Sequence, residues 1–324
     1  MNNQILGLHH VTAITSSAEK IYHFFTDILG LRLIKKTVNQ DDIETYHLYF
    51  TDDLGSPGTD MTFFDFPGVP KGLKGTNTIS RTSFRVKNDA ALTYWVARFD
   101  EYQIEHGEIS QRFGKKYLEF EDFDNQRYQL ISDETNTGVP AGVPWKNANV
   151  PAESALIGLG PSFVTVENLD HMKLVLEQVL GFKHISTDGQ FHLFEVGEGG
   201  NGASVIVEHR TDLPIAREGF GAVHHLAFRV ENRESLEYWI KRLSQLEFPN
   251  SGYVQRYYFE SEYFRAAPGI LFELATDGPG FLEDETYETA GEILALPPFL
   301  EPKRQEIEAY VRPFDTSKTN QQRS

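Results

Sequence analysis

The 324-residue chain contains no cysteine. This absence excludes disulfides, thiolate metal sites and cysteine nucleophiles, so any metal must be bound by His, Asp or Glu side chains. Basic residues are scarce as well: 30 Lys and Arg stand against 47 Asp and Glu, which gives a formal net charge of -17 at pH 7. Such a charge repels polyanions, and no basic stripe offsets it locally, so we expect no nucleic-acid partner.

Long apolar runs and targeting signals are also missing. No uninterrupted apolar stretch is long enough to cross a bilayer, so we expect no membrane span. The first residues, MNNQILGLHH, lack the basic start, apolar stretch and cleavage site of a secretory signal, and we therefore expect a cytoplasmic protein. The composition, 40% hydrophobic and 24% charged, is typical of a folded soluble protein. It is compatible with a homo-oligomer but does not specify one.

One pattern recurs four times along the chain: a strand, an amphipathic helix, then two or three strands. The four copies begin at LGLHHVTAIT, TISRTSFRVKN, ALIGLGPSFVTVEN and GAVHHLAFRVEN. The pattern predicts an α+β protein of four βαβββ modules, paired into curved mixed sheets whose concave faces form clefts.

The segment TNTGVPAGVPWKNANVPAES, residues 135–154, has the Gly, Pro and Asn content of a linker and no apolar period. It predicts two domains of two modules each, residues 1–134 and 155–280. Residues 281–324 then form a tail, for which we expect one helix and a disordered polar end.

Adjacent histidines occur in the first strands of the first and fourth copies, whereas the other two copies read TSF and PSF there. Because side chains alternate along a strand, His10 and His225 point to the concave face if the apolar residues beside them pack under the helix. The same argument in GILFELATDG places Glu273 on that face, where a carboxylate is costly unless it is paired or bound to metal. Two imidazoles and one carboxylate are the ligands of the facial triad that leaves three positions on iron(II) open.

A single strand histidine is usually structural, so the recurrence of the pair is what favours metal. The remaining histidines sit singly, without a partner pattern, and we interpret most of them as structural or solvated: His23, His47, His106, His171, His184, His192 and His209.

At these residues the chain resembles the vicinal oxygen chelate superfamily, whose unit is the βαβββ module. The strings LGLHHVTAIT, KKTVNQDDIETYHLYFTDDLGSPGTDMTFF, GAVHHLAFRV, YFRAAPGILFELATDGPGF and LPPFLEPKR together resemble its hydroquinone-type ring-cleaving dioxygenases. The resemblance implies a metal centre of His10, His225 and Glu273 holding Fe²⁺, with Mn²⁺ or Zn²⁺ possible in purified protein. It implies further residues around the metal ligands that act in catalysis: His9, Thr12, His224, Arg256 and Tyr263.

The implied reaction inserts both atoms of O₂ into a small aromatic diol. His224 and Tyr263 are the residue types suited to moving protons, and Arg256 is suited to holding anionic charge. Strand alternation alone turns His9 and His224 away from the metal. Whether the diol is a hydroquinone or a catechol rests on the resemblance and not on the residue pattern.

Two other functions stay open. A glyoxalase-like isomerase or thiol transferase needs a second glutamate from the first module, but Phe63 and Phe64 stand near that position, with Asp65 close by. A metal-free protein that binds small aromatic compounds is the third reading. We expect metal in one cleft only, because Gln129 stands where the second module would need a carboxylate.

Overall fold

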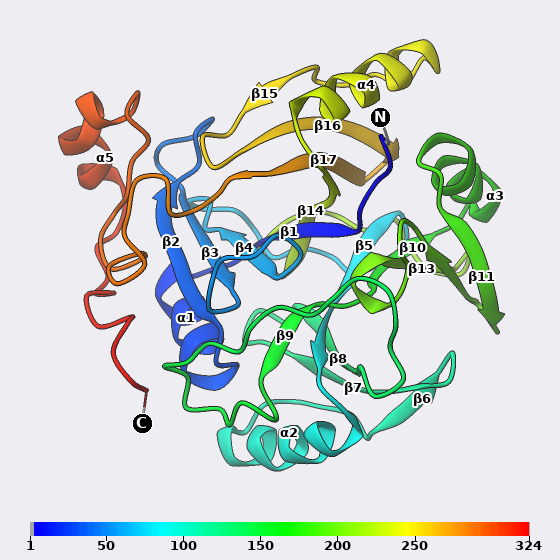
Figure 1. Cartoon of the computed structure of the whole chain (residues 1–324), viewed down its shortest axis with the longest axis horizontal. Helices are drawn as coiled ribbons and strands as arrows, with labels where there is room; N and C mark the ends of the chain where they lie inside the picture. Colours follow the sequence, from blue (N-terminus) through cyan, green and yellow to red (C-terminus); the bar gives the residue numbers. More distant parts are fainter. Residues whose placement is uncertain (1–2, 324) are drawn as a thin grey trace.

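The computed structural model describes residues 3–323, and most of its strands belong to two large mixed β-sheets (Figure 1). The 8-stranded sheet, called here the site sheet, has the strand order β15-β16-β17-β14-β1-β4-β3-β2. Its strands are β1 (Leu8–Ile14), β2 (Arg32–Val38), β3 (Tyr46–Thr51), β4 (Asp60–Phe64), β14 (Ala222–Val230), β15 (Val254–Gln255), β16 (Phe259–Ala267) and β17 (Ile270–Pro279).

The second sheet has the order β11-β12-β13-β10-β5-β8-β7-β6, and β9 pairs with β5 beside this path. Its strands are β5 (Thr78–Val86), β6 (Ser110–Arg112), β7 (Lys115–Glu121), β8 (Arg127–Ser132), β9 (Leu156–Leu159), β10 (Ser162–Val166), β11 (Lys183–Asp188), β12 (Phe191–Glu195) and β13 (Ser204–His209).

Each sheet joins modules that are remote in the sequence. In the site sheet β1 of the first module pairs antiparallel with β14 of the fourth, and in the second sheet β5 of the second module pairs antiparallel with β10 of the third. The segments that connect the sheets run beside each other, with bridges such as Lys71 to Phe220 and Thr76 to Ile215. These pairings confirm the predicted fold class. They also show that sheet membership does not follow the division at residues 135–154, so the predicted domain boundaries stay a prediction about the sequence.

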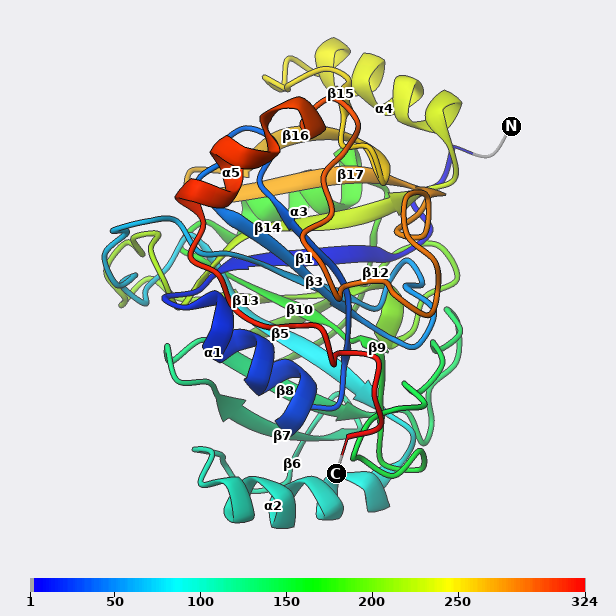
Figure 2. The same ribbon diagram turned by 90° about the vertical axis from the view of Figure 1, so that its left-hand side faces the viewer.

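Each module carries its helix directly after its first strand, and each helix begins at a residue whose side chain accepts a backbone N–H. The capping residues are Ser17, Asn88, Asn168 and Asn232. The helices are α1 (Ala18–His23), α2 (Asp89–Tyr102), α3 (Leu169–Leu174) and α4 (Arg233–Gln245), followed in the tail by α5 (Arg304–Tyr310). In the first and third modules the helix widens into a π-helical turn, Phe24–Ile28 and Val175–Val179, which the sequence pattern did not predict. Figure 2 shows α4 and α2 at opposite ends of the molecule, with the sheets between them.

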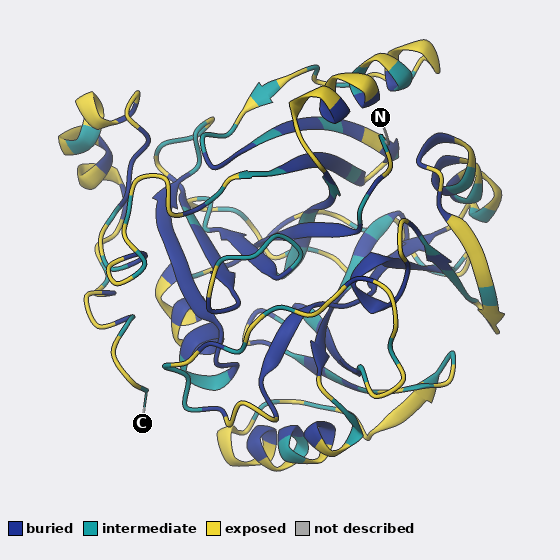
Figure 3. Ribbon diagram, in the orientation of Figure 1, coloured by how far each residue is buried: buried dark blue, intermediate teal, exposed yellow. Residues whose placement is uncertain are grey.

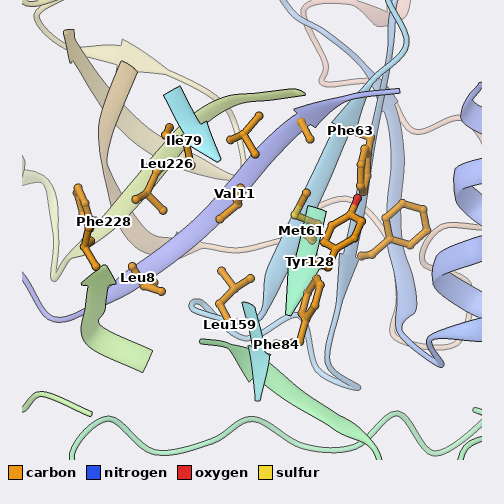
Figure 4. Close-up of a cluster of buried hydrophobic side chains, with 14 of the residues drawn as sticks. Leu8, Val11, Met61, Phe63, Ile79, Phe84, Tyr128, Leu159, Leu226 and Phe228 are labelled. Atoms are coloured by element: carbon orange, nitrogen blue, oxygen red, sulfur yellow. The ribbon is translucent and has the colours of Figure 1, made fainter. Parts of the chain in front are cut away.

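The apolar faces of both sheets contribute to one core. Leu8 and Val11 of β1, Leu226 of β14, Phe84 of β5 and Leu159 of β9 belong to the same buried cluster (Figure 4). Exposed positions are found mainly on the outer sides of the helices, the edge strands and the loops (Figure 3). Because one face of the site sheet packs against the core, polar side chains on its other face are available to form a functional site.

The tail packs along β2, at the edge of the site sheet. The Ala295 N–H donates to the Lys36 carbonyl at 2.9 Å, and the Lys36 ammonium donates to the Phe314 carbonyl at 2.7 Å. Arg323 pairs with Asp27 at 2.8 Å, so the expectation of a disordered polar end is wrong for the described residues. Among residues 3–323, no helix has the length and apolar character needed to cross a membrane.

Candidate metal centre

Three side chains from neighbouring strands of the site sheet converge on one point. His10 Nε2 lies 3.1 Å from Glu273 Oε2, His225 Nε2 lies 3.0 Å from the same oxygen, and the two nitrogens are 3.1 Å apart. His10, His225 and Glu273 are 1%, 4% and 0% exposed. Among residues 3–323 they form the one group of three or more His, Asp or Glu side chains whose ligand atoms all lie within 4.8 Å of one another.

The spacing of these atoms fits a single octahedral ion. Ligands at about 2.1 Å from a metal are separated by about 3.0 Å in adjacent octahedral positions and by about 3.4 Å in tetrahedral ones. All three separations are 3.0–3.1 Å. Glu273 Oε2 makes no hydrogen bond of good geometry within the described part of the chain, although both imidazoles are near. The three atoms therefore lie at the mutual spacing of a facial set of ligands.

The carboxylate of this group is ionised. Burial by itself would raise the pKa of Glu273, but the His10 and His225 imidazoles hold it well below 4.5. Glu273 Oε1 accepts a hydrogen bond from Ser261 Oγ at 2.5 Å, which leaves Oε2 facing the histidines. Burial lowers the pKa of His225 to about 4, so its ring is neutral near pH 7 and can act as a ligand.

His9 fixes the ring orientation and tautomer of His10. Burial lowers the pKa of His9 to about 3, so this imidazole is neutral and carries one proton. His9 Nε2 lies 3.1 Å from the Thr276 carbonyl oxygen, which can only accept, so the proton is on Nε2. His9 Nδ1 must then accept from His10 Nδ1 at 2.8 Å, and the Nε2 lone pair of His10 is free for a metal.

Both histidine pairs owe their arrangement to β-bulges. In the pairing of β1 with β14, Leu8 lies opposite Phe228 and His10 opposite Ala227, so His9 has no partner. At the other end Thr12 lies opposite His225 and Ala13 opposite Val223, so His224 has none. A bulge interrupts strict alternation. The expectation that His9 and His224 point away from the metal ligands is therefore wrong: His224 Nδ1 is 2.8 Å from His225 Nδ1, and His224 lines the cavity described next.

A cavity of about 380 Å³ opens beside the two imidazoles. Its residues come from the first and fourth modules: His10, Asn39, Gln40, Asp41, Asp42, His47, Tyr49, Phe64, Phe66, His224, His225, Arg256, Phe259, Tyr263 and Leu271. Larger hollows, of about 410 and 530 Å³, lie at the second sheet and its connecting segments. Neither of these includes the His10, His225 and Glu273 group.

Comparison with known proteins identifies relatives that match almost the whole chain. MhqA of Bacillus subtilis (strain 168), provisionally named a ring-cleaving dioxygenase, is 44% identical over 96% of this chain and 99% of its own length. Residues 7–130 match the family model of the Glyoxalase/Bleomycin resistance protein/Dioxygenase superfamily. The chain belongs to this superfamily.

Other members of the superfamily extend the likeness. The chlorohydroquinone/hydroquinone 1,2-dioxygenase of Sphingobium indicum (strain UT26S) is 31% identical over 94% of this chain and 95% of its own length. A crystal structure of a provisionally named dioxygenase from Bacillus subtilis superposes with a TM-score of 0.89 at 33% identity, covering 96% of this chain and 98% of that one. Glyoxalase I from Zea mays, with a TM-score of 0.58 at 13% identity, covers 84% of this chain and 92% of its own and shares the fold.

The other residues that the resemblance implied around the candidate metal centre are buried to different degrees. Arg256 Nε donates to the Tyr263 hydroxyl at 3.0 Å, and its Nη1 pairs with Asp41 at 2.9 Å across the cavity mouth. The Tyr263 ring lies 5.8 Å from the His225 ring, and burial, with the Glu273 charge, raises the pKa of Tyr263, so its hydroxyl stays protonated. Thr12 is fully buried and does not line the cavity; its hydroxyl is 2.8 Å from that of Thr62.

Strand pairing relates the two halves of the site. Two residues after His225, Ala227 lies opposite Glu273; two residues after His10, Thr12 lies opposite Thr62. Thr62 is thus the first-module counterpart of Glu273. We expected Phe63 and Phe64 near this position. Phe63 is the next residue along β4, and its side chain lies in the core. The position carries a hydroxyl and no carboxylate.

His47 and Tyr49 are site residues that the sequence analysis missed. His47 was grouped with the structural or solvated histidines, but both residues line the cavity from β3. Alternation could have found them, because Leu48 and Phe50 lie in the core and leave His47 and Tyr49 on the other face. The same counting makes Tyr49, opposite Thr62, the counterpart of Tyr263, opposite Glu273.

Proposed function

We propose that this protein is an iron(II)-dependent dioxygenase that opens the ring of a hydroquinone-type aromatic diol. The observation that carries the proposal is the convergence of His10, His225 and Glu273, with the two imidazoles in the wall of a cavity of about 380 Å³. Two histidines and one carboxylate on one face suit iron(II), which keeps its other positions open. The names of the Bacillus subtilis and Sphingobium indicum relatives support ring cleavage and a hydroquinone substrate.

Bound iron(II) would supply adjacent positions for a diol oxygen and O₂, and a path for electrons between them. The chain would do the rest. Phe64, Phe259 and Leu271 give the cavity apolar surface for an aromatic ring. Arg256 places a fixed positive charge beside the Tyr263 hydroxyl, so we assign it to stabilising negative charge that develops on the substrate.

Proton handling would fall to His224 and Tyr263. Both line the cavity, and His224 contacts the His225 ring through the Nδ1 pair. Burial lowers the pKa of His224, so its ring is neutral and can accept a proton. His9 and Thr12, which lie deeper, would hold His10 and Thr62 in place.

A glyoxalase-like function is less well supported. It would use a second glutamate from the first module, and the matching position is Thr62. Asp65, the other acidic candidate, accepts from the Tyr46 backbone N–H at 2.8 Å at the end of β4 and is not among the residues that line the cavity. A cytoplasmic location and a homo-oligomer remain predictions from the sequence.

The experiment is oxygen uptake with a substrate panel. Protein purified without oxygen and loaded with Fe²⁺, Mn²⁺ or Zn²⁺ is given hydroquinone, methylhydroquinone, chlorohydroquinone or catechol. The proposal expects uptake with Fe²⁺ and the para-diols, and none with Zn²⁺. Absence of near-stoichiometric metal binding would remove both enzyme functions and favour a binding protein, whereas metal binding without uptake on any diol would favour the isomerase.

A further inference from the structure

Tyr49 and His47 form a hydrogen-bonded pair on the first-module wall of the cavity. The Tyr49 hydroxyl lies 2.7 Å from His47 Nδ1, and the two rings pack at a tilt of 34° with centroids 4.0 Å apart. His47 also packs on Phe64, with centroids 4.3 Å apart. Both residues line the cavity, so a ligand there can reach the pair, and the Tyr49 hydroxyl and the imidazole are joined by a hydrogen bond.

Behind His47 the hydrogen bonds continue away from the cavity. His47 Nε2 lies 2.9 Å from the Thr62 hydroxyl, which lies 2.8 Å from the Thr12 hydroxyl. Thr62 and Thr12 are both fully buried and do not line the cavity. A neutral imidazole and a hydroxyl can each donate and accept, so the order Tyr49 to His47 to Thr62 to Thr12 is a continuous path for donated protons.

The counterpart tyrosine on the opposite wall has the opposite chemistry. Tyr263 accepts from Arg256 Nε at 3.0 Å, and a guanidinium can only donate. Tyr49 instead contacts an imidazole that can accept. The two matched tyrosines therefore differ in the direction of proton transfer that they favour. Tyr263 is suited to donating a proton to a ligand in the cavity, and Tyr49 is suited to accepting one.

The surroundings keep the pair neutral without a ligand. Burial first, then the positive forms of nearby groups, lower the pKa of His47 well below 6.5; burial and nearby acids raise the pKa of Tyr49 well above 10. The titratable and charged groups that act on the pair are His10, Asp60, His225, Arg256, Tyr263 and Glu273. Near pH 7 His47 thus keeps a free lone pair, and Tyr49 keeps a proton to pass on.

We propose that Tyr49 and His47 form a proton-accepting dyad for the diol hydroxyl that does not bind the metal, so that the site selects para-diols. The inference rests on the proposed function. In a para-diol the second hydroxyl is on the far side of the ring from the metal and needs its own proton acceptor, whereas both catechol oxygens are adjacent and can share the metal. Tyr49 touches the substrate and is the catalytic residue of the dyad; His47 acts through it.

The proton transfer balances without an outside reagent. The bond between the substrate oxygen and its proton breaks, and the electron pair stays on that oxygen. The proton bonds to the Tyr49 oxygen while the original Tyr49 proton bonds to His47 Nδ1. The ring becomes an imidazolium whose Nε2–H donates to Thr62.

The test compares Tyr49→Phe and His47→Gln with wild type and with His192→Gln, which removes a histidine from the second sheet. In Fe²⁺-loaded protein we expect kcat/KM for hydroquinone at pH 7 to fall on the order of 100-fold in both dyad variants. The loss should shrink by roughly tenfold per pH unit as pH rises, because solvent then removes the proton. His192→Gln should match wild type. An equal loss at every pH would mean a structural role and would overturn the dyad.

Two readouts do not depend on turnover. Under anaerobic conditions the variants should bind hydroquinone more weakly but bind hydroquinone monomethyl ether, which has no second proton, as wild type does; equal weakening of both ligands contradicts the proposal. In the metal-free protein, nitrogen NMR should find His47 neutral from pH 6 to 8 with its proton on Nε2, and a proton on Nδ1 would reverse the path and overturn it. If wild-type protein shows no oxygen uptake, the proposed function is wrong as well. If wild type shows uptake and the Tyr49 and His47 variants match it, only the dyad is wrong.

Discussion

His9 and His224 occupy matching β-bulges on the two central strands of the site sheet, each directly before a residue of the candidate metal centre. The bulge lets two adjacent side chains serve one site, because it interrupts the alternation that would send the first of them to the core. The repeated His-His pair is therefore a device for placing a ligand and a hydrogen-bonding neighbour together, once from each half of the sheet.

Replacing the bulge histidines should weaken the centre without abolishing it. In His9→Ala, His10 loses the acceptor that fixes its tautomer, and in His224→Ala, His225 loses its Nδ1 neighbour. We expect metal to remain bound but affinity or turnover to fall by roughly 10- to 100-fold. Metal titration and oxygen uptake check this. Complete loss of metal in these variants, with metal retained in His10→Ala and His225→Ala, would show that the ligands are assigned one residue too late.

Removing a ligand should abolish metal binding while the fold survives. His10→Ala, His225→Ala and Glu273→Ala each leave two protein ligands, and no other His, Asp or Glu of the described residues joins the group. The core lies on the other face of the sheet, so cooperative unfolding should be retained. Elemental analysis and thermal unfolding are the measurements, with His192→Ala as the histidine control. Near-stoichiometric metal in any of the three ligand variants would contradict the assignment.

Thr62→Glu should convert the open site into a closed one. The substitution places a second carboxylate at the counterpart of Glu273, where it can take a further position on the metal. We expect metal to stay bound and oxygen uptake with hydroquinone to fall by on the order of 100-fold or more, because a position needed by substrate or O₂ is filled. Thr62→Gln has a similar volume without the charge and should retain more activity than Thr62→Glu. Equal activity of the two variants would show that Thr62 does not face the open side of the metal.

Glu262 of β16, which lies opposite Leu274 of β17, should contribute less to the stability of the metal-free protein as pH rises. It is fully buried, neither of its carboxylate oxygens has a hydrogen-bond partner within residues 3–323, and burial together with the Glu273 charge raises its pKa to about 8. The folded state thus binds this proton more tightly than the unfolded state, so the stabilisation is complete below pH 4.5 and is lost as pH rises toward 8.

Glu262→Gln removes this titration. Calorimetry of the metal-free protein should show the variant more stable than wild type by roughly 4 kcal/mol at pH 8, and little changed at pH 4.5. Glu283→Gln removes one negative charge from an exposed position and should show no such difference. A stability difference between Glu262→Gln and wild type that does not grow between pH 4.5 and 8 would contradict the raised pKa of Glu262.

The modules and the candidate metal centre could be predicted from the sequence because both depend on local repetition. Four strand and helix patterns recur, and the alternation of Phe272 and Leu274 with Glu273 is read directly from the chain. The bulges at His9 and His224 depend on which strand lies beside β1, and β14 is more than two hundred residues away. The same non-local pairing hid the match of Thr62 with Glu273. His47 was missed for another reason: its strand was recognised, but its face was not followed to the cavity.

Isotope labelling of the product tests whether both atoms of O₂ enter the opened ring. Fe²⁺-loaded wild-type protein is given hydroquinone under ¹⁸O₂, and the product is analysed by mass spectrometry. A dioxygenase of the proposed kind forms a ring-opened acid that carries both labelled oxygen atoms; we expect it from wild type and not from Glu273→Ala. A product with the ring intact, or oxygen consumed without label in an opened ring, would contradict the proposed function.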